Sequence, residues 1–242
     1  MDRLGSAMAA LEPLVDARVG VGHDFSAASS TMVIACAAMS HLRPPPFHLF
    51  EATTGLDAKR LFVRDPNRVW FQHGVPGFGD SIDEVAACLK AIVEEQEVER
   101  LVVMGSSAGG FAALAFGAVL EADLVISFSP QTIIDRAWLD AAGDDRWRGH
   151  LNTLDKLGGP DPAWTDLCVA LPRETRPGTV FEVHYPTQLE SDRRHAERLT
   201  GLQGVTMLGH EQAAHNFIRG LRNRGELPEI FRAAGLVGPD EA

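Results

Sequence analysis

A glycine–serine pattern stands at the junction of a strand-like run and a helix-like run, and it constrains the fold more than any other feature of the chain. Residues 105–109 read Gly-Ser-Ser-Ala-Gly, which matches G-x-S-x-G with Ser107 at its centre. The preceding residues 100–104 form a short, mostly apolar run that is typical of a buried parallel strand. Residues 110–119 are rich in Ala, Leu and Phe, which favour a buried helix. The sequence therefore predicts a strand, a sharp turn with Ser107 at its apex, and a helix.

This arrangement is a nucleophile elbow, and it makes Ser107 a candidate nucleophile. Small residues at 105 and 109 allow the strand and the helix to approach closely, and they tolerate a strained turn that bulky side chains would oppose. The start of the following helix offers free N–H groups and the positive end of a dipole to a developing oxyanion. The N–H group of Ala108 is the predicted first donor of an oxyanion hole.

Length and charge exclude several classes of protein. The chain has 242 residues, which suits one α/β domain over residues 1–242. Its formal net charge of -11 argues against a nucleic-acid partner and leaves a small molecule as the expected one. No apolar run is long enough to span a bilayer, and no signal peptide is evident, so we expect no membrane partner and a cytoplasmic location.

Composition also argues against a metal or a bound cofactor. The three cysteines, Cys36, Cys88 and Cys168, form no C-x-x-C pair, and no zinc-ligand spacing is present. No glycine loop of the dinucleotide or P-loop kind occurs either. We therefore expect neither a metal nor a cofactor. The oligomeric state is left open.

The order of predicted elements is that of a mostly parallel sheet covered by helices on both faces. Residues 1–30 are weakly patterned, with a short helix over 8–15 and a loop over 23–30. The remaining predicted strands cover 31–38, 47–51, 60–63, 68–72, 101–104, 122–128, 179–184 and 205–208, and the helices cover 81–95, 110–119, 192–202, 213–221 and 227–234. Residues 131–177 interrupt this alternation and are predicted to form a cap over the cleft; the alternative is an excursion that packs on the sheet edge.

A serine hydroxyl needs a base and a third group that orients the base. In proteins with a nucleophile elbow, the three residues follow along the chain in the order Ser, acid, His. Asp192 follows a late predicted strand and is the preferred acid, with Glu190 in reserve; a helix N-cap is the other role open to Asp192. After the last strand, His210 and His215 are both candidate bases. His215 is preferred because a loop of several residues lets its imidazole turn back over the sheet.

The second oxyanion donor should come from a loop that follows an early strand. Residues 73–77 read His-Gly-Val-Pro-Gly after the strand predicted over 68–72, so the N–H of Val75 is the predicted donor, with Gly74 next. Gly74, His73 and Trp138 are the predicted substrate contacts. The three tryptophans of residues 131–177 indicate an apolar or ring-bearing substrate, unless they are packing residues.

Together these residues resemble the α/β-hydrolase superfamily over residues 30–235. The resemblance implies a nucleophilic Ser107, a base His215 and an orienting Asp192. Residues 61–77 also look like small hydrolases of bacterial polysaccharide or natural-product pathways.

The implied activity is acyl transfer through an acyl-serine, on a small ester or thioester that is free or carrier-bound. An esterase, a thioesterase, an acyltransferase and a cyclase all fit this chemistry. The alternatives are a lyase on the same fold that uses the histidine as base, and an inactive binding protein.

Overall fold

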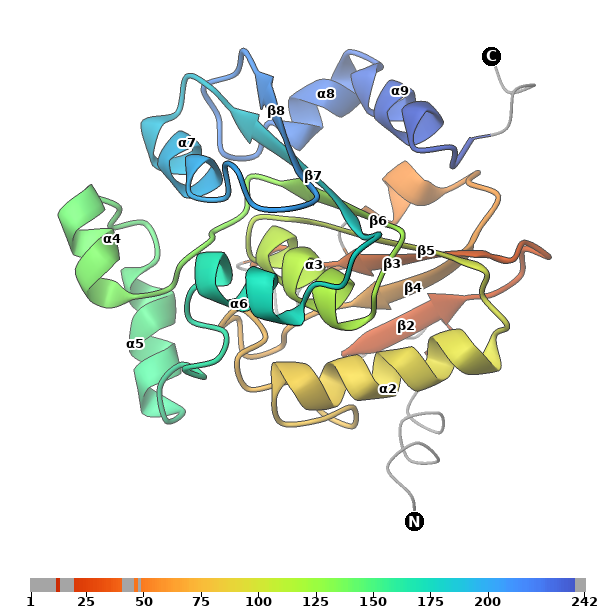
Figure 1. The fold of residues 1–242 in the computed structure, drawn as a ribbon, viewed down its shortest axis with the longest axis horizontal. Helices are drawn as coiled ribbons and strands as arrows, with labels where there is room; N and C mark the ends of the chain where they lie inside the picture. The colour runs from red at the N-terminus through yellow and green to blue at the C-terminus, as the bar shows by residue number, and fades with distance from the viewer. Residues whose placement is uncertain (1–11, 14–19, 41–45, 48, 238–242) are drawn as a thin grey trace.

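The computed structural model describes residues 12–13, 20–40, 46–47 and 49–237 (Figure 1). Within them, one sheet contains eight strands in the order β1-β2-β4-β3-β5-β6-β7-β8. Every neighbouring pair is parallel except β2 and β4. The strands are β1 Glu12–Pro13, β2 Val21–Asp24, β3 Thr31–Cys36, β4 Lys59–Val63, β5 Arg100–Ser106, β6 Leu124–Phe128, β7 Val180–Pro186 and β8 Val205–His210.

Helices cover both faces of this sheet, as predicted. The helices are η2 Glu51–Thr53, α2 Ile82–Glu95, α3 Ala108–Val119, α4 Arg136–Ala142, α5 Arg148–Lys156, α6 Leu167–Glu174, α7 Glu190–Glu197, α8 Ile218–Asn223 and α9 Glu226–Ala233. In Figure 1, α8 and α9 lie on one side of the sheet, and α2, α3 and α6 lie on the other.

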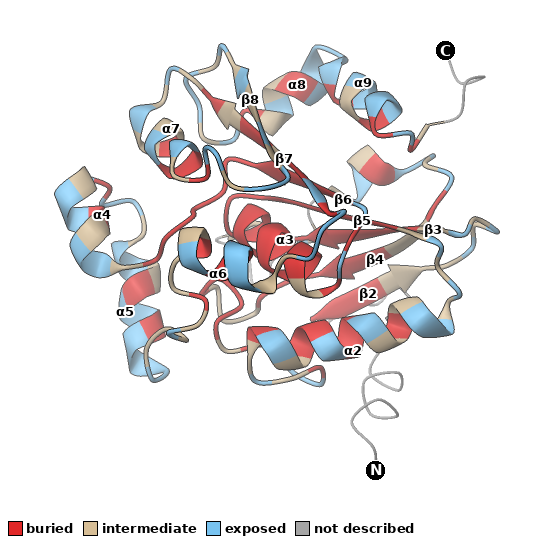
Figure 2. Ribbon diagram, viewed as in Figure 1, coloured by how far each residue is buried: buried red, intermediate tan, exposed pale blue. Residues whose placement is uncertain are grey.

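The strand side chains divide between two apolar cores because successive residues of a strand face opposite ways. In β3, Met32 and Ile34 join the core beneath α2, α3 and α6, whereas Val33 joins the core beneath α8 and α9. Figure 2 shows that the central strands and α3 are buried over most of their length, whereas α2 has one buried and one exposed face. The central strands are therefore rigidly enclosed, and their carboxyl ends form a firm base for a site.

Close contact between β5 and α3 depends on the two glycines of the elbow. A Cβ atom on Gly105 would lie 2.0 Å from the carbonyl oxygen of Gly109. A Cβ atom on Gly109 would lie 2.2 Å from the carbonyl oxygen of Cys36, at the end of β3. Both distances are far below van der Waals contact, so any other residue would push the helix away from the sheet.

In the first third of the chain, the strands predicted over 31–38 and 60–63 are present as β3 and β4, but two other predicted strands are absent. The described residues of 47–51 form no strand: a turn at 49–50 leads into η2, where Thr53 donates backbone and side-chain hydrogen bonds to the Leu49 carbonyl. The four-residue strand β2 replaces part of the weakly patterned region and pairs with β4. The helix predicted over 8–15 lies outside the described residues except for 12–13, which form β1.

Residues 68–72 do not form a strand either; they form successive turns. The buried carboxylate of Asp65 accepts three backbone N–H bonds, from Asn67, Val69 and Phe71. N–H groups held by one side chain cannot join a neighbouring strand, so the chain curls around Asp65. Burial raises the pKa of Asp65, and the backbone hydrogen bonds oppose that rise.

We expect Gly105→Ala to destabilise the protein by about 1–3 kcal/mol or more, because the added methyl group overlaps the Gly109 carbonyl. Gly149→Ala is the matched control: Gly149 lies within α5, and a Cβ atom there meets nothing within 4 Å. This control should stabilise the protein by about 0.5–1 kcal/mol. Denaturant midpoints measure both, and equal stability of the two variants would contradict the packing argument.

Candidate functional site

Ser107 occupies a strained backbone position between β5 and α3. Its φ and ψ angles are 58° and -123°, a conformation that a residue with a side chain rarely adopts. Its N–H group donates to the Phe128 carbonyl at 2.8 Å, which anchors the turn to β6. Only 6% of Ser107 is exposed, and its hydroxyl lines a cavity at the carboxyl ends of the strands.

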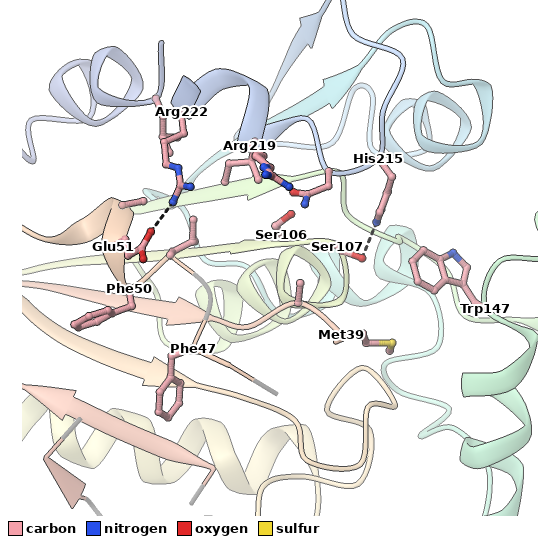
Figure 3. A pocket seen from close by; sticks show the side chains of 16 residues that line it. Met39, Phe47, Phe50, Glu51, Ser106, Ser107, Trp147, His215, Arg219 and Arg222 are labelled. Atoms are coloured by element: carbon pink, nitrogen blue, oxygen red, sulfur yellow. Dashed lines mark hydrogen bonds and ion pairs between the residues drawn. The ribbon is translucent and has the colours of Figure 1, made fainter. Parts of the chain in front are cut away.

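The structure brings Ser107, His215 and Asp192 together. His215 follows β8, and its Nε2 atom lies 2.8 Å from Ser107 Oγ (Figure 3). Its Nδ1 atom lies 2.7 Å from Asp192 Oδ2. Asp192 lies in the first turn of α7, whose N-cap is Leu189, so Asp192 does not cap that helix. The three side chains therefore have the arrangement that the sequence predicts for a nucleophile, a base and an orienting acid.

The two reserve candidates have other partners. His210 Nε2 lies 2.9 Å from His184 Nδ1, and its ring packs against Phe217. Glu190 pairs with Arg194 in an exposed i,i+4 ion pair at 2.5 Å. Within the described residues, neither forms a hydrogen bond with Ser107, whereas His215 does.

Asp192 is held as a carboxylate although only 1% of its side chain is exposed. Burial opposes its ionisation, but hydrogen bonds and the charges of His215 and Arg146 outweigh that effect and lower its pKa. An ionised Asp192 accepts the Nδ1–H of His215, which leaves Nε2 free to accept the proton of Ser107. This tautomer is the one that a general base requires.

Arg146 is a partner of the predicted acid Asp192 that sequence reasoning missed. Its guanidinium donates to Asp192 Oδ1 at 2.7 Å and makes two bonds to Asp144, at 2.8 and 2.6 Å. Asp144 is buried, and its pKa is lowered because Arg146 and His195 outweigh the effect of burial. Arg146 therefore ties residues 131–177 to the acid of the triad. No sequence motif marks it, because its two partners are 2 and 46 positions away.

Gln131 is a second neighbour of Ser107 that the sequence did not indicate. Its Oε1 atom lies 3.3 Å from Ser107 Oγ and accepts a hydrogen bond from Trp70 Nε1 at 3.1 Å. Because the indole N–H can only donate, it holds the amide oxygen, not the nitrogen, on this side. The shorter contact of Ser107 is with His215, which remains its principal partner.

One predicted oxyanion donor is well placed, and the other is not. Ala108 begins α3 directly after Ser107, and the described residues supply no acceptor for its N–H group. The N–H of Val75, by contrast, donates to the Gly79 carbonyl at 2.9 Å, and its side chain is fully buried. Gly74 likewise donates its N–H to the Phe71 carbonyl at 2.9 Å. Because the N–H of Val75 is already bonded within its own turn and Val75 does not line the cavity with Ser107, it is not placed as the second donor.

The loop after β3 places two other N–H groups beside the cavity. β3 pairs with β5 so that Cys36 faces Gly105, which sets Ala38 and Met39 beside the elbow. Both residues line the cavity with Ser107, and within the described residues neither N–H group has an acceptor. The sequence predicted a strand over 31–38 and held no signal for this placement, because only the sheet order makes β3 the neighbour of β5.

The cavity at Ser107 has a volume of about 470 Å³. Trp147 lines it from the segment 131–177 and packs edge-on against the His215 ring. The remaining lining residues are mostly apolar with a few polar or charged ones: Ala38, Met39, Phe47, Leu49, Phe50, Glu51, Ala52, Ser106, Asn216, Ile218, Arg219, Arg222 and Leu227.

Two predicted substrate contacts lie elsewhere. Trp138 packs on His195 and Arg198, away from the residues that line this cavity. His73 Nε2 contacts the Gly159 carbonyl at 3.0 Å. Trp164 is fully buried beside α2, where its indole donates to Asp83. The prediction of an aromatic contact from residues 131–177 therefore fits Trp147 and not Trp138.

The described residues hold no group of three or more His, Cys, Asp or Glu side chains arranged to bind a metal ion. Burial raises the pKa of Cys36, and burial is also the main cause that raises the pKa of Cys168 to about 11, so neither thiol is a ready nucleophile. Among the helices in the part of the chain that is described, none is long and apolar enough to cross a bilayer.

We expect Arg146→Met to slow covalent labelling of Ser107 by a fluorophosphonate about tenfold or more, because the Asp192 carboxylate loses a charged partner. The change should also raise the pKa of Asp192, so that it protonates at higher pH and the acid limb of the labelling profile moves up. Arg146→Lys should restore part of the rate. Arg148→Met is the control, and identical profiles for Arg146→Met and the wild type would contradict this role.

The fold is that of several solved structures, although no protein-family model and no curated protein matches the chain. It superposes on the capsule O-acetyltransferase of Neisseria meningitidis serogroup A with a TM-score of 0.64 and 12% identity, over 88% of this chain and 91% of that one. A putative esterase from Staphylococcus aureus matches with a TM-score of 0.58 and 17% identity, over 88% and 77%.

A Glycosylation Associate Protein (Gap123) complex from Streptococcus agalactiae matches with a TM-score of 0.63 and 11% identity over 88% of this chain. Our chain spans 43% of that longer chain. These likenesses, together with the sheet order and the elbow at Ser107, show that the chain has the α/β-hydrolase fold.

Proposed function

We propose that this protein is a serine acyl-transfer enzyme that cleaves a small ester or thioester through an acyl-Ser107 intermediate. The observation that carries the proposal is the continuous chain of contacts from Ser107 through His215 to Asp192, at 2.8 and 2.7 Å, at the wall of a cavity. The names of the structural neighbours, an O-acetyltransferase and a putative esterase, are consistent with it.

In the first half of the reaction, Ser107 Oγ attacks the carbonyl carbon of the substrate while His215 Nε2 takes the hydroxyl proton. The carbonyl oxygen becomes an oxyanion, which the N–H groups of Ala108 and of Ala38 or Met39 stabilise. The bond from carbon to the leaving oxygen or sulfur then breaks, and His215 returns the proton to the leaving group.

In the second half, a second nucleophile attacks the acyl-serine and His215 takes its proton. Water releases a carboxylic acid, whereas an alcohol or amine receives the acyl group. Asp192 stabilises the imidazolium in both halves, and its low pKa keeps it ionised as that positive charge forms. Whether water or another acceptor completes the reaction depends on how fully the bound acceptor excludes water from the cavity.

The test is intact-protein mass spectrometry after incubation with a fluorophosphonate. We expect one adduct on the wild type and none on Ser107→Ala, because only an activated serine reacts at a useful rate. Ser106→Ala is the matched control, since Ser106 is the adjacent residue and lines the same cavity, and it should keep the adduct. A folded wild type that takes up no adduct would overturn the acyl-enzyme mechanism and favour a lyase or a binding protein.

A second measurement tests whether Ser107 reacts because His215 and Asp192 activate it or only because it is accessible. Asp192→Asn leaves the side-chain shape nearly unchanged but favours the wrong tautomer of His215, so the turnover of an activated ester should fall roughly 10⁴-fold. Glu190→Gln alters the adjacent exposed carboxylate and should leave turnover unchanged. Equal losses in the two variants would argue against Asp192 as the orienting acid.

A further inference from the structure

The wall of the cavity that α8 forms carries two arginines. Arg219 and Arg222 both line the cavity that contains Ser107, and in Figure 3 they enter it from α8, with Phe47 and Phe50 on the opposite wall. Arg222 pairs with Glu51, another lining residue, at 2.8 Å. The cavity is therefore apolar on one side and charged on the other.

Arg219 stands apart from the other arginines that the structure describes. Each of those interacts with a carboxylate, a backbone carbonyl or another group. The guanidinium of Arg219 has no hydrogen bond or ion pair within the described residues. The chain has an excess of acidic residues, 33 against 22 basic ones, so acidic partners are plentiful. An arginine at the cavity with no carboxylate partner among the described residues is therefore unusual in a protein whose net charge is negative.

The charges at this wall leave one positive charge uncompensated. Glu51 neutralises Arg222, and Arg219 has no protein counterion among the described residues. Arg219 is exposed, so water hydrates it in the free protein. A ligand that fills the cavity displaces part of that water and must supply an acceptor in return, which an anionic oxygen does best.

We propose that the substrate carries an anionic group, a carboxylate or a phosphate, that Arg219 binds while the reacting carbonyl lies at Ser107. This inference rests on the proposed acyl-transfer function and adds the chemical class of its substrate. Arg219 acts on binding and not on the proton transfers, because neither His215 nor Asp192 has a contact with it. A carboxylate matches the single uncompensated charge, whereas a phosphate also draws on Arg222.

Two matched pairs of substrates test the proposal and identify the source of the anion. The first pair is the para-nitrophenyl hemiester of glutaric acid and neutral para-nitrophenyl valerate. The second pair is acetyl-4′-phosphopantetheine and acetyl-pantetheine, which share a thioester and differ only in the terminal phosphate. We expect the wild type to prefer the anionic member of one pair by about ten- to a hundredfold in kcat/KM, as one charge-assisted hydrogen bond implies. Preference in the first pair assigns a carboxylate, and preference in the second a phosphate.

Substitutions then assign the preference to Arg219. Arg219→Gln should abolish this preference, measured as the ratio of kcat/KM for the anionic and the neutral member of the pair. Glu51→Gln frees Arg222 and should strengthen the preference. Arg232→Gln is the control, since Arg232 pairs with Glu229 on α9 and does not line the cavity. No preference in either pair, or a preference that survives Arg219→Gln, overturns the proposal.

A binding measurement keeps this inference separable from the proposed reaction. Isothermal titration of glutarate, and separately of 4′-phosphopantetheine, into Ser107→Ala protein needs no turnover, and it is repeated with Arg219→Gln added. Binding of either anion that depends on Arg219 supports the anion site, even where fluorophosphonate labelling of the wild type fails. If the wild type is fully labelled but neither anion shows binding that depends on Arg219, the anion site alone is overturned. The binding should weaken as salt rises, because Arg219 is exposed.

Discussion

The contact between the end of β5 and the start of α3 is the constraint on which the rest of the site depends. The two backbones lie closer together than a Cβ atom at residue 105 or 109 would allow, so both positions need glycine. The same contact forces Ser107 into a strained conformation and points its hydroxyl away from the packed core. Because the two cores hold β5 and α3 firmly, this strain does not relax by local movement.

The acid side of the site is built from a different kind of interaction. Asp192 is almost fully buried, and burial alone would neutralise it, so its charge depends on partners from two other segments. His215 reaches it from the loop after β8, and Arg146 reaches it from residues 131–177. The excursion in the middle of the chain therefore contributes to the electrostatics of the site as well as to its wall, where Trp147 lies.

Prediction from sequence succeeded where local pattern and local geometry coincide. The elbow, the buried helix after it and the alternation from residue 80 onward are short-range features, since each follows from a run of apolar residues and its flanking turns. It failed at residues 68–72, where one buried carboxylate, Asp65, accepts N–H groups that the pattern assigned to a strand. The displaced strand then misdirected the choice of Val75 as an oxyanion donor.

The sequence by itself determined the class of fold, a candidate nucleophile and a short list of partners for Ser107, because these depend on residue type, spacing and chain order. Only the tertiary structure decided between His210 and His215, set Ala38 and Met39 beside the elbow, and brought Arg146 to Asp192. It also left Arg219 unpaired at the cavity. These outcomes depend on the order of strands in the sheet and on contacts between charged residues that are far apart in the sequence. Neither produces a periodic pattern of residues in the sequence.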